Sequence, residues 1–354
     1  MTDWPFSTAE LTAGLRRYFA EPALKVKGLN EYPLQTGRIG QTTGRVRGLR
    51  VEYGVGLASV GIDCVVKEPR GTSRAGLAGA GRREVGLYHS LAAQLPMPTP
   101  ALIAADFAGE WLVMEAVEAD LPPEAWTPEH YRLGVKTLAS LHERFWNLGE
   151  DLAAYTWLAR PLGSDFEIHV YAAAQAVEKM MVNDHPRLIT TSMVVLGALG
   201  QIISQVEQVV EPLRAVPQTL LHGNFWPGNV ALQSDGEMVL LDWELAGLGP
   251  GILDFVAFIT LCQWERGGLP VLEADLFALY QSEMRQRVAA PWSAEEWAVL
   301  WDYALIWRFI QEMFTWAASA SPEQFNARAQ QFERVWLRPV LAAVDRRLRP
   351  MFYI

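Results

Sequence analysis

Two side chains that could hold a metal ion stand close together in the sequence, Asn229 and Asp242. Residues 231–240 between them alternate in polarity around an Asp-Gly pair, a strong local signal for a β-hairpin. Such a hairpin would return Asp242 to the neighbourhood of Asn229. Because Mg²⁺ prefers hard oxygen ligands and is usually held by one or two side chains together with phosphates and water, the pair predicts a site for Mg²⁺ and a phosphate-bearing ligand.

A short loop precedes this hairpin and adds a second motif. Residues 222–224 read His-Gly-Asn, and Asp242 is followed by Trp and Glu. With Asn229, this pattern resembles the aminoglycoside phosphotransferase and choline kinase-like family, whose members are relatives of protein kinases. The family pattern is His-Gly-Asp-x-x-x-x-Asn, in which the Asp accepts or orients the proton of the substrate hydroxyl. Here that position is Asn224, and an amide cannot be a general base.

The resemblance implies an α+β, protein-kinase-like fold of two lobes, with an N-terminal antiparallel sheet plus helix and a larger, mainly helical C-terminal lobe. We expect residues 1–118 to form the nucleotide-binding lobe and residues 119–354 to form the catalytic and substrate-binding lobe. The resemblance covers roughly residues 33–260 through separate motifs, and the catalytic segment is the most specific of them.

A lysine and a glutamate upstream could form an ion pair. Lys67 ends a predicted strand, and Glu84 lies in a predicted helix, residues 82–91. In kinase-like folds such a pair positions the lysine on the α- and β-phosphates of the nucleotide. The alternative is that both side chains are solvated. Because the downstream loop matches as well, we favour the pair.

Two further nucleotide contacts follow from the resemblance. Gly40 and Thr42 lie in a glycine-rich turn that could lay backbone N–H groups over phosphates, although most such connections are ordinary hairpin turns. The predicted strand 111–116 resembles the hinge strand of the family. There the backbone around Glu115 and Ala116 would hydrogen-bond adenine. These contacts imply ATP as the cofactor, with Mg²⁺.

Other residues are expected to support the catalytic loop or the acceptor pocket. Asp254 matches a family Asp that accepts backbone N–H groups and fixes the loop, and His222 supports the same loop. His142, on an apolar helix, is predicted to be a packed structural histidine. Helices between residues 292 and 348 would wall the acceptor pocket. The polar candidates there are Asp302, Arg308, Gln311 and Glu312.

Composition excludes several classes of protein. The 354 residues, 50% of them hydrophobic, suffice for two lobes with a sizeable core. Thirty basic against 40 acidic residues give a net charge of −10, which argues against a sequence-independent nucleic-acid binder and is compatible with a cationic small-molecule acceptor. Cys64 and Cys262 are far apart, so neither a disulfide framework nor a cysteine metal site is indicated.

Apolar segments are too short or too interrupted for a membrane protein. The most apolar one, residues 192–210, is predicted to be a single helix buried in the C-terminal lobe, too polar after Gln201 to span a membrane. The N-terminus lacks a basic region followed by an apolar run. We therefore expect a cytoplasmic protein without membrane insertion; the sequence does not indicate its oligomeric state.

Two functions fit these motifs. One is an ATP-dependent phosphotransferase acting on a small hydroxylated or aminated molecule, in which Lys67 and Asp242 neutralise charge and Asn224 orients the acceptor. Because general-base catalysis is worth about 10²–10⁴-fold, loss of the base leaves a slow enzyme. A nearby carboxylate such as Glu244 could also replace the base. The alternative is a catalytically inactive pseudokinase, a nucleotide-binding or scaffold protein; we favour the enzyme narrowly.

Overall fold

The computed structural model describes residues 3–34, 44–56, 58–69 and 78–348. Within these ranges the chain forms two compact units. The first contains the described residues up to 124 together with residues 228–246, and the second contains residues 125–227 and 247–348. The first unit therefore includes a segment that a single lobe boundary near residue 118 leaves in the C-terminal lobe.

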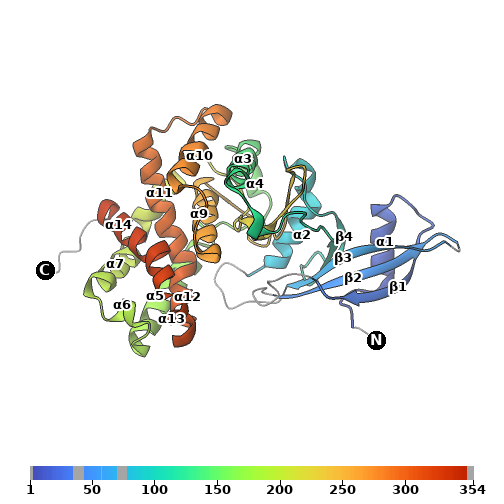
Figure 1. The fold of residues 1–354 in the computed structure, drawn as a ribbon, viewed down its shortest axis with the longest axis horizontal. Coiled ribbons are helices and arrows are strands. Elements are labelled where there is room, and N and C mark those ends of the chain that lie inside the picture. The colour runs from blue at the N-terminus through green and yellow to red at the C-terminus, as the bar shows by residue number, and fades with distance from the viewer. Residues whose placement is uncertain (1–2, 35–43, 57, 70–77, 349–354) are drawn as a thin grey trace. The chain divides into compact units, whose positions relative to one another are not determined.

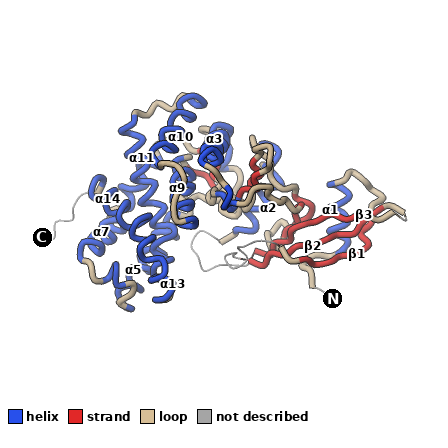
Figure 2. The backbone as a smooth tube through the Cα atoms, viewed as in Figure 1, coloured by secondary structure: helices blue, strands red, loops and turns tan. Residues whose placement is uncertain are grey.

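The first unit is built on a five-stranded antiparallel sheet with the strand order β1-β2-β3-β5-β4. Its strands are Lys25–Tyr32 (β1), Gly44–Gly54 (β2), Val60–Pro69 (β3), Leu102–Ala105 (β4) and Leu112–Glu115 (β5) (Figures 1 and 2). The sequence predicted β3, the strand of Lys67, and β5, but it did not reveal β1. That strand lies at the edge of the sheet, and its side chains are exposed or half-buried, so it lacks the apolar alternation that identifies a strand.

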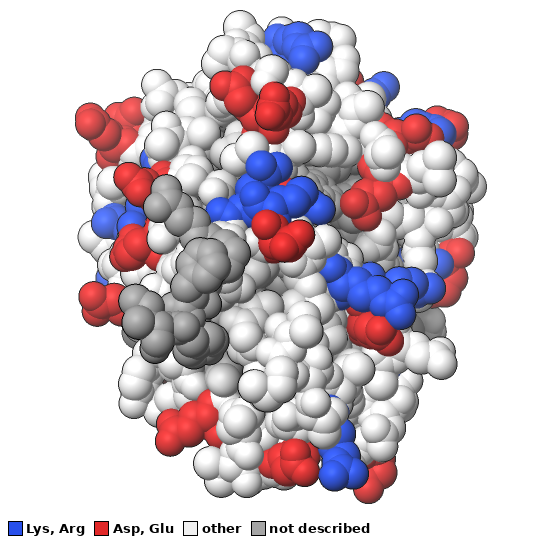
Figure 3. Space-filling model, turned by 90° about the vertical axis from the view of Figure 1, so that its left-hand side faces the viewer, with Lys and Arg blue, Asp and Glu red and all other residues white. Residues whose placement is uncertain are grey.

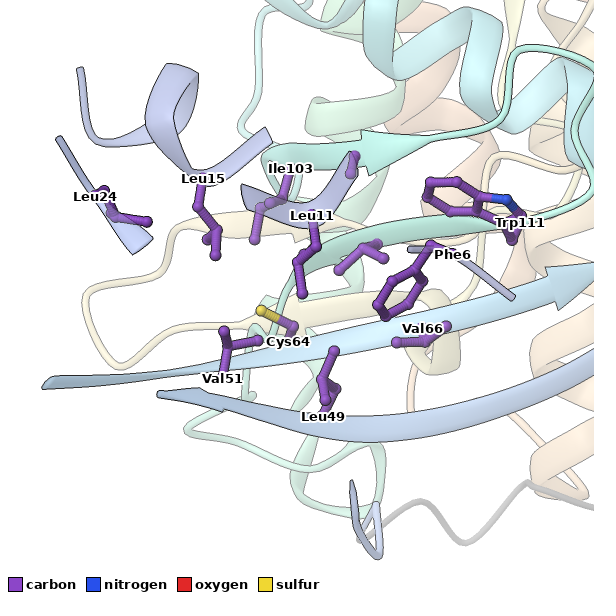
Figure 4. Packing of buried hydrophobic residues seen from close by; sticks show 12 residues of the cluster. Phe6, Leu11, Leu15, Leu24, Leu49, Val51, Cys64, Val66, Ile103 and Trp111 are labelled. Carbon is purple, nitrogen blue, oxygen red and sulfur yellow. The ribbon is translucent and has the colours of Figure 1, made fainter. Parts of the chain in front are cut away.

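Helix α1, Thr8–Tyr18, covers one face of this sheet. A capping box starts the helix: the side chain of Ser7 accepts the N–H of Glu10 at 3.2 Å, and the Glu10 carboxylate accepts the N–H of Ser7 at 2.7 Å. Leu11 and Leu15 point from the helix into a core that the sheet completes with Val51, Cys64 and other residues (Figure 4).

A second helix and a hairpin complete the first unit. Helix α2, Ala80–Ser90, follows the sheet lysine, with the short 3₁₀ turns η2, Ala92–Gln94, and η3, Pro123–Ala125, further along the chain. Strands β7, Val230–Leu232, and β8, Met238–Leu240, form the predicted hairpin after the 3₁₀ turn η4, Pro227–Asn229. The hairpin joins this unit through backbone hydrogen bonds from Leu240 to Pro98 at 3.0 Å and from Leu121 to Leu232 at 3.2 Å.

The second unit is mainly helical, with a two-stranded sheet of β6, Thr219–Leu221, and β9, Gly247–Gly249. Its helices are α3 Pro128–Arg144, α4 Gly149–Ala153, α5 Phe166–Asn183, α6 Arg187–Thr190, α7 Met193–Ser204, α8 Val206–Arg214, α9 Ile252–Arg266, α10 Glu273–Val288, α11 Ala294–Arg308, α12 Phe314–Ser319, α13 Pro322–Phe332 and α14 Arg338–Arg347. The π-helical turn η5, Phe309–Met313, joins α11 to α12, and η6, Glu333–Leu337, joins α13 to α14.

Aromatic side chains fill the interior of the second unit. Trp297, Trp307 and Trp336 are fully buried, and the ring of Phe255 stacks on that of Tyr280 with centroids 4.5 Å apart. Buried aromatic area of this kind contributes strongly to stability. The tryptophans of the C-terminal helices therefore serve largely as core residues. The antiparallel sheet with its helix, followed by this helical unit, confirms the predicted α+β fold.

The apolar segment 192–210 differs from its prediction. Instead of one helix it forms α7 and α8, which break at Gln205 and bend by 54°. The prediction of a single helix is wrong because the buried positions keep helical spacing across the break, so periodicity did not reveal it. Among the described helices, none alone is long and apolar enough to cross a membrane, whereas α7 and α8 taken together pass by length and composition.

Charged side chains are interspersed on the surface shown in Figure 3. On this face, groups of Lys and Arg lie beside groups of Asp and Glu, and they do not merge into one extended basic area. The ion pairs at the C-terminal helices agree, since Arg338 contacts Glu333 at 2.8 Å and Arg346 contacts Asp302 at 2.6 Å.

Candidate functional site

The centre of the candidate site in the first unit is the ammonium group of Lys67. Strand β3 carries Lys67, helix α2 carries Glu84, and Asp242 follows strand β8. Lys67 Nζ donates to Glu84 Oε2 at 2.7 Å, to Glu84 Oε1 at 2.9 Å and to Asp242 Oδ1 at 2.6 Å. The side chains of these three residues are 14%, 0% and 29% exposed, respectively. The predicted contact is present, and complete burial excludes a solvated Glu84.

Burial and charge act against each other in this cluster. Burial alone would lower the pKa of Lys67, but the carboxylates of Asp242, Glu84 and Glu244 hold it well above the usual value of 10.5. Burial raises the pKa of Glu84 from 4.5 to about 7; Lys67 opposes this shift, while Asp242 and Glu244 add to it. One ammonium thus faces several carboxylates, and this excess of negative charge favours binding of a further cation.

Asp242 has an unusual backbone conformation. Its φ of 62° lies in the left-handed region, which few residues other than glycine adopt and for which aspartate is enriched. Just before it, the N–H of Leu241 donates to the carbonyl oxygen of Asn229 at 2.9 Å. The hairpin therefore returns the chain beside Asn229, as predicted. Strained backbone of this kind, maintained by the surrounding structure, is common at functional sites.

The oxygen-bearing side chains fit Mg²⁺ by their chemistry. The carboxylate of Asp242 already faces a positive charge, since Lys67 Nζ contacts it, and the amide of Asn229 comes from the start of the same hairpin. In the part of the chain that the structure describes, no three His, Cys, Asp or Glu side chains gather into a metal-binding group. An Mg²⁺ ion held by Asn229 and Asp242 would take its other ligands from phosphates and water, as is usual for this ion.

Two residues of helix α2 were not foreseen from the sequence. Arg83 is buried, and its Nε donates to the carbonyl oxygen of Glu244 at 2.7 Å, which ties down the chain that follows Asp242. Tyr88 lies one helical turn after Glu84, and burial together with the Glu84 carboxylate raises the pKa of its hydroxyl well above 10.0. Helical spacing from Glu84 could have found Tyr88, whereas the contact of Arg83 with a distant carbonyl leaves no local signal.

The loop that contains Asn224 is fixed within the second unit. Asp254 Oδ2 accepts the N–H of His222 at 2.6 Å, and Asp254 Oδ1 accepts the N–H of Gly223 at 2.8 Å. His222 Nδ1 accepts the N–H of Asn224 at 3.3 Å. Because a carboxylate that accepts two backbone N–H groups makes strong charge-assisted bonds, Asp254 determines the geometry of the loop.

His142 packs behind this loop. It is fully buried, its Nδ1 lies 2.8 Å from the hydroxyl oxygen of Tyr280, and its Nε2 lies 3.5 Å from Asp254 Oδ2. These contacts match the predicted structural histidine.

The structure separates the four acceptor-pocket candidates. Arg308 lies at the loop, since its Nη1 donates to the carbonyl oxygen of Gly223 at 3.3 Å. Glu312 contacts Arg308 Nη2 at 2.6 Å, one turn further along. Asp302 instead receives hydrogen bonds from two arginines near the end of α14, and Gln311 is half-buried on the π turn. Arg308 therefore contacts the loop directly, and Glu312 is joined to it through Arg308.

The other predicted nucleotide contacts are those of the glycine-rich turn and of the backbone at Glu115 and Ala116. Gly40 and Thr42 lie outside the described residues. The N–H of Glu115 donates to the carbonyl of Ala101 and the N–H of Ala116 donates to the carbonyl of Asp63, both at 3.0 Å. These N–H groups are thus used within the protein. An adenine ring at Glu115 and Ala116 would have to bind to their carbonyl oxygens.

These features together define a protein of the kinase-like class. A sheet lysine paired with a helix glutamate, a hairpin followed by an aspartate, and a His-Gly-Asn loop held by an aspartate occur in the order expected from the motifs. A family model described as the phosphotransferase enzyme family matches residues 52–292, and the chain belongs to this family.

Solved structures share this fold. An ethanolamine kinase from Plasmodium vivax has a TM-score of 0.56 and 10% identity, over 89% of this chain and 83% of that one. An aminoglycoside phosphotransferase from Alicyclobacillus acidocaldarius has a TM-score of 0.53 and 17% identity, over 98% and 97%. At such low identities the likeness shows the fold. Among proteins with curated descriptions, none matches the sequence.

Proposed function

We propose that this protein transfers the γ-phosphoryl group of ATP to a hydroxyl or amino group of a small molecule, with Mg²⁺. The observation that supports the proposal is the position of Lys67, whose ammonium is held between the carboxylates of Glu84 and Asp242. A lysine fixed in this way can contact the α- and β-phosphates of a nucleotide, and the family assignment is that of phosphotransferases.

Each group has one role in the proposed reaction. Lys67 would bind phosphate oxygens while Glu84 holds it in place, and Asn229 and Asp242 would hold Mg²⁺. When bound, the metal ion would neutralise the charge on the phosphates. Asn224 would orient the acceptor by hydrogen bonding. Since phosphoryl transfer has a loose transition state, positioning and charge neutralisation account for most of the rate enhancement.

The adenine and acceptor contacts form part of the same proposal. The carbonyl oxygens of Glu115 and Ala116 would accept hydrogen bonds from the amino group of adenine. His222 and Asp254 would keep the loop of the acceptor site in one geometry. Cationic alcohols and amines are the first acceptors to test, because the chain carries a net charge of −10.

A second candidate function is favoured by Asn224 itself. An amide at the position of the base suits a pseudokinase that binds Mg²⁺ and ATP through Lys67 and Asp242 and transfers no phosphoryl group. Both functions need the same nucleotide site. They differ in turnover, which makes nucleotide binding the first measurement and product formation the second.

The first experiment measures thermal stabilisation by ATP with and without Mg²⁺. Saturation at 100 times the dissociation constant adds about 2.7 kcal/mol. Wild type should be stabilised in a manner dependent on Mg²⁺, and Asp242→Ala should lose this effect. Asp235→Ala is the matched control, because Asp235 lies in the turn of the same hairpin and accepts only a local N–H, that of Glu237 at 2.9 Å. No stabilisation of wild type at millimolar ATP would contradict both functions.

The second experiment screens acceptors by ADP release. Release of ADP together with a phosphorylated product from wild type supports the enzyme. Product formed only by Asn224→Asp, with ATP bound equally well by wild type, supports the pseudokinase.

A further inference from the structure

An amide at position 224 leaves the proton of the acceptor without a base in the loop. Among the carboxylates near the proposed machinery, Glu244 is one candidate. It belongs to the first unit, where its charge helps to hold the pKa of Lys67 high and its carbonyl oxygen accepts Arg83 Nε. Its negative charge thus acts on Lys67.

The second candidate is Glu312, which is linked to the loop of Asn224 by one guanidinium group. Arg308 Nη1 donates to the carbonyl oxygen of Gly223, one peptide unit from the Cα of Asn224, and Arg308 Nη2 contacts Glu312 Oε1 at 2.6 Å. The side chains of Arg308 and Glu312 are only 8% and 12% exposed. Since the guanidinium is rigid and planar, it fixes the carboxylate near the loop.

The backbone at this point also departs from a regular helix. Arg308 ends α11, and Glu312 lies in the π-helical turn η5 that connects α11 with α12. Such turns are rare, and they are found frequently at functional sites. The turn and the ion pair are two observations that distinguish these residues from a surface pair on an ordinary helix.

We propose that Glu312 is the general base of the reaction, in place of the aspartate that position 224 lacks, and that Arg308 is its positioning residue. This inference rests on the proposed phosphoryl transfer. The proton of the acceptor O–H goes to a carboxylate oxygen of Glu312 as the acceptor oxygen forms a bond to the γ-phosphorus. The bond from that phosphorus to the bridging oxygen breaks, and its electron pair leaves on ADP.

The same geometry accounts for the amide at position 224. An aspartate there would add a second carboxylate to the loop that Arg308 contacts, although Glu312 already neutralises this largely buried guanidinium. Uncompensated charge in such surroundings is costly. Asn224 avoids this cost and still offers an amide that can donate a hydrogen bond to, or accept one from, the acceptor hydroxyl.

The test uses water as the acceptor, so that no unidentified substrate is needed. Hydrolysis of Mg-ATP is measured for wild type, Glu312→Gln, Asn224→Asp and the double variant, alongside thermal stabilisation by Mg-ATP. Glu283→Gln is the matched control, because Glu283 forms an ion pair of the same spacing with Arg287 on α10 at 2.9 Å. We expect Glu312→Gln to lower kcat by about 10²–10⁴-fold with unchanged stabilisation by Mg-ATP.

The rescue distinguishes a base from a structural support. The double variant should have a kcat at least about tenfold higher than that of Glu312→Gln, because Asn224→Asp supplies a carboxylate in the loop. Glu283→Gln should behave as wild type. Equal rates for wild type and Glu312→Gln would overturn the proposal. So would a double variant no faster than Glu312→Gln, or wild type that binds Mg-ATP without hydrolysing it. If Mg-ATP does not stabilise the wild-type protein, the proposed function is contradicted, and this inference fails with it.

Discussion

Replacement of Lys67 by methionine tests the buried charge cluster most directly. Lys67→Met keeps the length of the side chain and leaves the carboxylate of Glu84, which is 0% exposed, without its cation. Removing one partner of a buried ion pair costs about 3–5 kcal/mol, because the remaining charge is uncompensated. Asp242 adds less to this cost, since it is 29% exposed and water can solvate it. We therefore expect a loss of about 3–5 kcal/mol in the free energy of unfolding at pH 8.

The pH dependence follows from the pKa of Glu84. Its value is about 7 in the folded protein and 4.5 in the unfolded reference, so the folded state binds more protons between these pH values. The contribution of this group to stability is therefore present at acidic pH and is lost as the pH rises from 4.5 to 7. In Lys67→Met the opposing cation is gone, which keeps Glu84 protonated to higher pH. Protonation removes the buried charge, so Lys67→Met should cost less at pH 5 than at pH 8.

Urea unfolding of four proteins measures these effects. They are wild type, Lys67→Met, Glu84→Gln and the double variant, each at pH 5 and pH 8. The double variant should regain most of the stability that Lys67→Met loses at pH 8, because Glu84→Gln removes the unpaired charge. A cost of Lys67→Met below about 1 kcal/mol at pH 8, or a cost equal at both pH values, would refute the reasoning from burial.

Three further substitutions test other contacts by urea unfolding. Asp254→Asn weakens two charge-assisted hydrogen bonds to the loop of residues 222–224 and should cost about 1.5–3 kcal/mol; an unchanged free energy of unfolding would show that the loop does not depend on these bonds. Gly81→Ala places a Cβ 2.1 Å from the carbonyl oxygen of Gly109, so α2 must shift, at an expected cost of about 1–3 kcal/mol. Gly197→Ala meets nothing within 4 Å in α7 and should stabilise by about 0.5–1 kcal/mol; a loss there would contradict the open surroundings.

Local patterns in the sequence predicted the parts of the site that lie on regular elements. The contact of Lys67 with Glu84 followed from the family resemblance together with a predicted strand and helix in matching order. The hairpin that brings Asp242 back beside Asn229 followed from alternation around an Asp-Gly pair. The roles of these residues in catalysis stay predictions. They depend on ligands, which geometry within the protein does not test.

Other features depend on contacts between distant segments and left no local trace. Arg83 binds a carbonyl oxygen beyond the hairpin, and Arg308, which the sequence indicated only as a candidate for the acceptor pocket, binds the carbonyl oxygen of Gly223. Strand β1 is defined by pairing with β2 rather than by its own exposed side chains. Similarly, nothing in the apolar spacing of residues 192–210 marks the break at Gln205.

The position of residues 228–246 in the first unit has a consequence for protein synthesis. A ribosome adds about 5–20 residues per second, so on the order of ten seconds separate residue 124 from residue 246. During that time the sheet that carries Lys67 can form before Asp242 has been made. The carbonyl oxygen of Pro98 and the N–H of Leu121, which later bind the hairpin, then lack their hydrogen-bond partners. The nascent first unit is therefore incomplete until residues 125–227 of the second unit have been made.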